Sequence, residues 1–181
     1  TITTARRARG LPGAWSLAAV AIGCASIGTL GIMLILGIVP TGARYVIPIG
    51  GMLIGNCMNV ASVTAVRLLE DAADRRPQIE ASLALGASPR QSTTTLARRS
   101  VKLAMVPVID ATKTTGLVFL PGAMTGMILA GAEPLQAVRL QAVVMFMLLA
   151  AVALTATLMS YVGPGRLFTH HQQLRRLDSQ A

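Results

Sequence analysis

Long stretches with few or no charged residues alternate along the chain with shorter polar segments. A helix of about 20 apolar residues crosses the ~30 Å hydrocarbon core of a bilayer, and each stretch is long enough to contribute such a helix. We therefore predict transmembrane helices at about 14–39, 45–66, 103–132 and 139–163. The third is expected to be broken near Pro107 and Pro121, because proline removes a backbone hydrogen-bond donor.

The one long polar segment, residues 67–102, has a helix–elbow–helix pattern. Gly86 fits the position just past a helix end, where the backbone often takes the left-handed conformation. Ser88, Pro89 and Gln91 then have the spacing of a capping box that starts a second helix. Two helices joined by so short an elbow form a rigid, protruding shape. We expect this elbow to receive force from a soluble partner.

Composition supports a membrane protein. The 181 residues are 53% hydrophobic and 13% charged, whereas soluble domains are about 25% charged. Mean hydropathy is +0.62. Cys24 and Cys57 lie inside apolar runs and lack metal-type spacing, so they indicate neither a disulfide framework nor a zinc site. The expected fold is all-α: a polytopic membrane protein with at least four transmembrane helices and a coupling loop at 67–102.

Basic residues gather in three polar segments that fall on one side of the four predicted spans. These are the amino-terminal segment, the 67–102 loop with its seven Arg and Lys, and the carboxy-terminal tail. The positive-inside rule makes all three cytoplasmic, in a multi-pass protein of the plasma (inner) membrane. The net charge of +9 is then a property of the cytoplasmic side and does not indicate a nucleic-acid partner.

Asp110 and Lys113 are three residues apart, on one helical face. At the membrane interface they would form a modest surface pair. Deeper in the bilayer each charge costs ~2.5–3.5 kcal/mol, and such residues usually mark a transport pathway. Asn56 and Asn59 add polar groups to the second span. We interpret all four side chains as candidate pathway residues.

Several methionines lie in the apolar runs, Met52, Met58 and Met124 among them. Thioethers suit soft ions such as copper(I), whereas methionine also fills irregular gaps between membrane helices, so the sequence leaves any metal ligands unknown. Gln141 is interpreted as a contact between helices. The spans contain no Ser/His or Cys/His pair, which argues against nucleophilic or zinc catalysis.

The segment from Glu80 to Ser88 resembles the cytoplasmic coupling loop of ABC transporter permeases, which docks on an ATP-binding subunit. In importers of that superfamily a Leu-Pro follows the glycine sooner than Pro107 does here. An ordinary binding-protein-dependent importer is therefore not expected. The resemblance implies a coupling surface made of Glu80, Leu83, Leu85, Gly86, Ala87, Ser88, Pro89, Arg90 and Gln91.

A wider set of motifs resembles the FetB (YbbM, UPF0014) permease family. The motifs run in order through IPIGGMLIGN at 47–56, LGASPRQ at 85–91, DATKTTGLVFLPGAMTG at 110–126 and AGAEP at 130–134. The family pairs with a separate ATPase and is linked to iron export, and plant relatives are associated with aluminium tolerance and nucleotide-sugar transport. Its members have more amino-terminal spans, and this chain does not begin with Met, so we expect amino-terminal helices to be missing.

These observations predict the permease subunit of an ATP-driven exporter, not an enzyme, that moves metal ions such as iron. It would hold no cofactor of its own, work as a homodimer in the lipid bilayer, and bind a cytoplasmic ATPase that carries ATP and Mg. Export of a nucleotide sugar or another phosphate-bearing or lipid substrate, using Lys113 and Arg139, is the alternative. An intramembrane enzyme or a scaffold is a third. Candidate pathway residues are Asn56, Asn59, Asp110, Lys113, Pro121, Gly122 and Met124.

Overall fold

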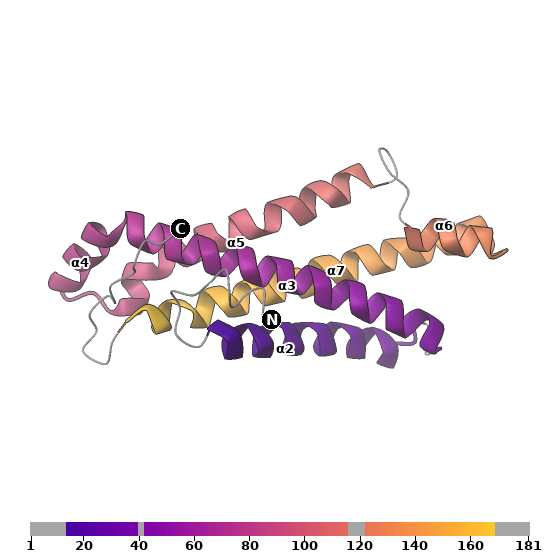
Figure 1. Cartoon of the computed structure of the whole chain (residues 1–181), viewed down its shortest axis with the longest axis horizontal. Helices are drawn as coiled ribbons and strands as arrows, with labels where there is room; N and C mark the ends of the chain where they lie inside the picture. Colours follow the sequence, from indigo (N-terminus) through magenta and orange to yellow (C-terminus); the bar gives the residue numbers. More distant parts are fainter. Residues whose placement is uncertain (1–13, 40–41, 116–121, 169–181) are drawn as a thin grey trace.

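The computed structural model describes residues 14–39, 42–115 and 122–168 of the chain. All the regular elements in these ranges are helical, which confirms the all-α prediction (Figure 1). They are α2 (Ala14–Ile35), α3 (Ala43–Asp74), α4 (Arg76–Ala84), α5 (Pro89–Thr114), α6 (Gly122–Leu129), α7 (Pro134–Val162) and the short 3-10 helix η1 (Pro164–Leu167).

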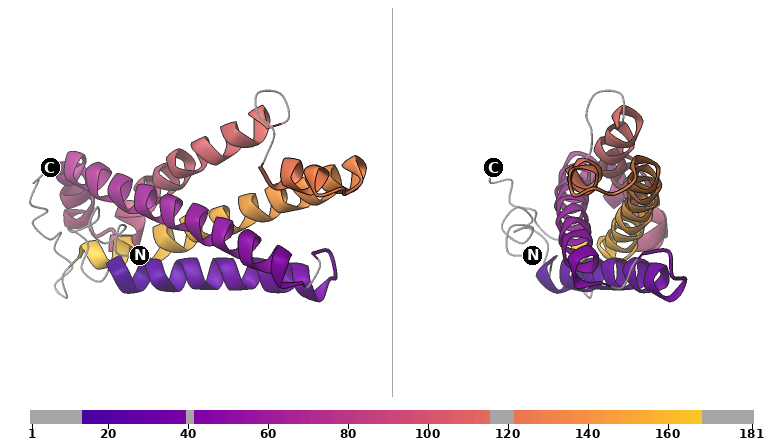
Figure 2. Two further views of the ribbon diagram at one scale, coloured as in Figure 1. Left: turned by 45° about the vertical axis from the view of Figure 1, so that its right-hand side comes forward. Right: turned by 90° about the vertical axis from the view of Figure 1, so that its right-hand side faces the viewer.

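The helices form an elongated bundle in which α2, α3 and α7 pack against one another along the long axis (Figures 1 and 2). Helix α5 packs on α3 and α7 near α4, and then diverges from both toward its carboxy-terminal end. Helix α6 packs on α7 at the end of the bundle opposite α4. We refer to these as the elbow end and the α6 end.

The core of the bundle contains many small side chains. Those of Ala18, Ala61, Ala151 and Ala156 are fully buried. Small residues let helix backbones approach closely, which is how membrane helices gain packing contacts without large side chains. Many large apolar side chains point outward instead, for example Ile27 and Phe146, so the outer surface suits lipid or further protein.

Three helices are long and apolar enough to cross a membrane, by length and composition: Ser16–Ile35, Tyr45–Asp74 and Pro134–Leu167. The protein is thus a polytopic membrane protein. The stretch 103–132, expected to be a further span, is divided between α5 and α6, and residues 116–121 lie outside the described ranges. A fourth span therefore stays a prediction.

Two helices differ in extent from the predicted spans. The expected interruption near Pro107 is absent, because α5 continues through this proline to Thr114. A single proline removes one helical hydrogen bond and leaves the bonds on either side in place, so it can bend a long helix without ending it. Helix α3 also continues beyond Val66, the predicted end of the second span, to Asp74. Much of the predicted loop is therefore helical.

Candidate functional site

The elbow between α4 and α5 begins with a Schellman motif. Gly86 has a φ of +89°, a conformation that L side chains rarely adopt. The N–H of Gly86 donates to the carbonyl of Leu83 at 2.9 Å, and the N–H of Ala87 donates to that of Ser82 at 3.0 Å. These bonds satisfy carbonyl groups that the end of a helix leaves open. The predicted helix stop at Gly86 is confirmed.

Helix α5 starts at Pro89, three residues after Gly86, with the predicted capping box. The Gln91 N–H donates to Ser88 Oγ at 3.3 Å, and the Ser88 N–H donates to Gln91 Oε1 at 2.9 Å. Pro89 occupies the start of α5, where a missing N–H has no consequence. Both helix ends at the elbow therefore find their hydrogen-bond partners inside the elbow itself.

The side chains around the elbow divide into anchored and exposed ones. Leu83 packs against the core, whereas Leu85 is 89% exposed. Glu80 forms an exposed ion pair with Arg76 at 2.7 Å. Arg90 lies over the ring of Tyr161, with its Cζ 4.2 Å from the ring centroid, and so connects the start of α5 to α7. The elbow therefore exposes the apolar side chain of Leu85, while Leu83 and Arg90 attach it to the rest of the bundle.

A cavity of about 700 Å³ lies toward the α6 end of the bundle, between α3, α6 and α7. Three methionines line it, Met52 from α3 and Met124 and Met127 from α6. Its wall contains two polar side chains, those of Tyr45 and Gln141. The Gln141 Oε1 atom is buried and accepts no hydrogen bond from the described residues. A buried acceptor left unpaired is costly, so this oxygen can receive a ligand.

The cavity contains some of the predicted pathway residues and not others. Gly122 and Met124 line it. Asn56 lies one turn along α3 from Met52, where its side-chain amide donates to the Met52 carbonyl at 2.9 Å, and Asn59 is exposed. Pro121 lies outside the described residues.

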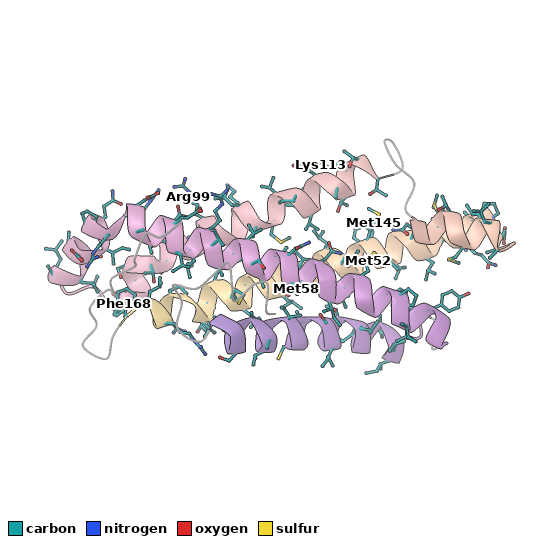
Figure 3. All side chains as sticks on the ribbon, in the orientation of Figure 1. Met52, Met58, Arg99, Lys113, Met145 and Phe168 are labelled. Carbon is teal, nitrogen blue, oxygen red and sulfur yellow. The ribbon has the colours of Figure 1, made fainter. Side chains whose placement is uncertain are left out.

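Asp110 and Lys113 lie near the end of α5 and line neither this cavity nor the groove described below. Their side chains are 61% and 71% exposed and form an ion pair with Nζ 3.6 Å from Oδ1. In Figure 3, Lys113 points away from α3 and α7. The structure thus brings the acid and the base together, but on the outside of the described bundle.

Sequence reasoning missed the cavity as a unit. Met52, Met124 and Met127 are among the methionines of the apolar runs, but the sequence did not group them, Tyr45 is not a candidate there, and Gln141 is interpreted only as a contact between helices. The signal that could have grouped them is the combination of a polar residue with methionines in otherwise apolar spans. Among the described residues no group of three or more His, Cys, Asp or Glu could hold a metal ion. The ligand-competent atoms of the cavity are therefore thioether sulfur and amide or phenol oxygen.

The fold and these two sites define a class: an all-helical, multi-pass membrane protein with a capped helical elbow at one end and a methionine-lined cavity toward the other. Residues 1–168 match the profile of the UPF0014 family, described as an uncharacterised protein family, and the chain belongs to that family. No solved structure matches it.

Three relatives illustrate the similarity. The UPF0014 membrane protein STAR2 of Oryza sativa is 45% identical over 95% of this chain and 60% of its own length. The UPF0014 membrane protein YjkA of Bacillus subtilis is 46% identical over 86% of the chain and 62% of its own length. The probable iron export permease protein FetB of Escherichia coli is 36% identical over 81% and 56%. The chain thus spans about three fifths of the length of these relatives.

Proposed function

We propose that this chain belongs to the permease subunit of an ATP-driven exporter. The observation that carries the proposal is the elbow at Gly86, which is capped on both sides and presents an exposed apolar tip at Leu85. A rigid protrusion at one end of a membrane bundle can transmit the movement of a soluble ATPase, whereas a flexible loop would dissipate it. ATP and Mg would be bound by that partner, and the permease would work as a homodimer.

The orientation follows from charge. The elbow end contains most of the described basic residues, which the positive-inside rule makes cytoplasmic. ATP binding would then close the ATPase dimer against the elbow from the cytoplasm. Helices α3, α5 and α7 would move with it and change access to the cavity at the other end.

The proposed cargo is a metal ion such as iron. One relative is named a probable iron export permease, and its similarity extends over 81% of this chain. The unpaired oxygen of Gln141 and the methionines around it provide weak donors. Iron(II) accepts amide oxygen, and a transported ion must leave its site as readily as it enters. For a phosphate-bearing cargo, Lys113 is less suitable because Asp110 already neutralises part of its charge.

Inside-out vesicles that contain the full-length permease and its ATPase test this proposal. ATP-dependent accumulation of iron in the vesicles is expected, and it should require both subunits. If the vesicles accumulate a nucleotide sugar but no iron, the proposed cargo is wrong and the proposed coupling to the ATPase still stands. Iron movement that continues without the ATPase would overturn the coupling.

A further inference from the structure

A second hollow, of about 360 Å³, lies between the first half of α5 and the end of α7. Helix α5 contributes Arg90, Gln91 and Arg98 to it, and α7 contributes Thr157, Ser160 and Tyr161. We call it the basic groove. It lies at the elbow end, away from the methionine-lined cavity, and it contains Arg90 and Gln91 of the expected coupling surface.

The groove holds two arginines that have no carboxylate partner in the described part of the chain. Neither Arg90 nor Arg98 forms an ion pair with an acidic side chain among the described residues, whereas Arg67, Arg76 and Arg99 each do. Arg90 is held in place because its guanidinium lies on the Tyr161 ring. A guanidinium offers five N–H donors, and stacking on the ring leaves its edge available for hydrogen bonds. The groove therefore presents uncompensated positive charge.

Ser160 adds a buried hydroxyl. The residue is 4% exposed, and its Oγ has no hydrogen-bond partner among the described residues. Other hydroxyls of the groove are already engaged, since Thr94 donates to the Arg90 carbonyl at 2.7 Å and Thr157 to the Ala153 carbonyl at 2.7 Å. A hydroxyl that lines a hollow and makes no internal bond can donate to a ligand.

The groove also borders a candidate membrane-spanning helix. Thr157, Ser160 and Tyr161 all lie in the candidate span Pro134–Leu167. Leu154 and Leu158 share a helical face with Tyr161, and all three side chains are exposed. An apolar strip thus runs along α7 from the groove toward the middle of the bundle. A ligand with a charged head and an apolar chain matches both parts.

We propose that the basic groove binds the headgroup of an anionic phospholipid of the cytoplasmic leaflet. Its phosphate would lie between Arg90 and Arg98 and accept a hydrogen bond from the Ser160 hydroxyl. Its acyl chains would follow Leu154 and Leu158 along α7. Such a lipid joins the start of α5 to the end of α7, next to the elbow. Anionic lipid would therefore regulate the coupling between the elbow and the bundle.

Native mass spectrometry of the full-length protein, purified with equal amounts of phosphatidylglycerol and phosphatidylcholine, tests the proposal. The wild-type protein should retain phosphatidylglycerol preferentially. Arg98→Gln should lower that retention about fivefold, the contribution of one arginine near an anionic surface. Ser160→Ala removes only the hydroxyl and should lower it by a similar factor.

Matched controls make the result specific. Arg67→Gln removes an exposed arginine of α3 that does not line the groove, and Ser26→Ala removes another buried hydroxyl without a described partner. Both should retain phosphatidylglycerol as the wild type does. Equal losses in the controls, or no preference for the anionic lipid, would overturn the proposal. So would displacement of the lipid by millimolar inorganic phosphate, or loss of the ATPase from Arg98→Gln with lipid retention unchanged.

Discussion

The guanidinium of Arg90 lies over the ring of Tyr161, 4.2 Å from its centroid. Arg90 is the second residue of α5, directly after the elbow, and Tyr161 is the penultimate residue of α7. The contact gives a displaced elbow a direct connection to α7, without the whole length of α5 between them. A cation–π contact at an exposed site contributes ~0.5–1 kcal/mol, enough to bias a movement without locking it.

Tyr161→Leu should weaken this connection and leave the fold intact, because the side chain is 63% exposed. We expect metal transported per ATP hydrolysed to fall about two- to fivefold, the equivalent of the lost cation–π contact. Tyr161→Phe keeps the ring and should behave as the wild type. The measurement is parallel transport and ATP hydrolysis in proteoliposomes of fixed lipid composition. If the Leu and Phe variants transport the same amount of metal per ATP hydrolysed, the contact between Arg90 and Tyr161 plays no part in coupling.

Gly86→Val places a β-branched side chain at a φ of +89°, which costs ~1–2 kcal/mol and disturbs the Schellman motif. We expect substrate-stimulated ATP hydrolysis to be lost while the subunit still reaches the membrane. Gly37→Val is the matched control, because Gly37 also has positive φ and an open surrounding but lies at the end of α2. If both variants keep full stimulation, the elbow does not couple.

Gly163→Ala should destabilise the elbow end. A Cβ there would lie 2.5 Å from the Met159 carbonyl oxygen and 2.9 Å from Leu68 Cδ2. We expect a loss of ~1–3 kcal/mol, typical of overpacking, measured by thermal unfolding in detergent. Gly165→Ala meets no atom within 4 Å and should change stability by less than ~0.5 kcal/mol. Equal effects at the two glycines would contradict the close packing of α3 on this turn.

Gln141→Leu should separate stability from function. It removes a buried oxygen that has no described partner, so the protein should gain ~1 kcal/mol in stability. Metal transport should fall at the same time if the cavity holds the cargo. Gln136→Leu, at an exposed position of the same helix, serves as the control for both measurements. A variant that is stabilised and fully active would exclude Gln141 from the pathway.

Asp110→Asn tests the exposed ion pair at the end of α5. If the pair lines a water-filled pathway completed by other parts of the transporter, metal efflux from vesicles should fall at least tenfold. Glu70→Gln breaks the Arg67 pair, which is also exposed and has the same spacing, and should have little effect. Efflux that persists in Asp110→Asn would remove the pair from the pathway.

The elbow could be predicted from the sequence because all its signals are local. Gly86, Ser88, Pro89 and Gln91 lie within six consecutive residues, and the hydrogen bonds of the elbow reach back no further than Ser82. Local rules failed at Pro107, where the neighbouring turns keep α5 continuous.

The cavity could not be predicted in this way. Met52, Met127 and Gln141 belong to three helices, and only the packing of α3, α6 and α7 brings them to one wall. Hydrophobic periodicity does not specify which helices will be neighbours. The methionines could therefore be recognised in the sequence, but the fact that they line one cavity could not.

The double cap of the elbow also bears on how a partner would recognise it. A nine-residue helix such as α4 is only marginally stable on its own in water. The hydrogen bonds from Gly86 and Ala87 to its last turn hold its carboxy-terminal end in place. Docking would then require almost no loss of conformational entropy from this side of the interface. A preorganised surface of this kind raises the affinity for a partner without adding any contact. The elbow itself would not have to refold when a partner binds or leaves.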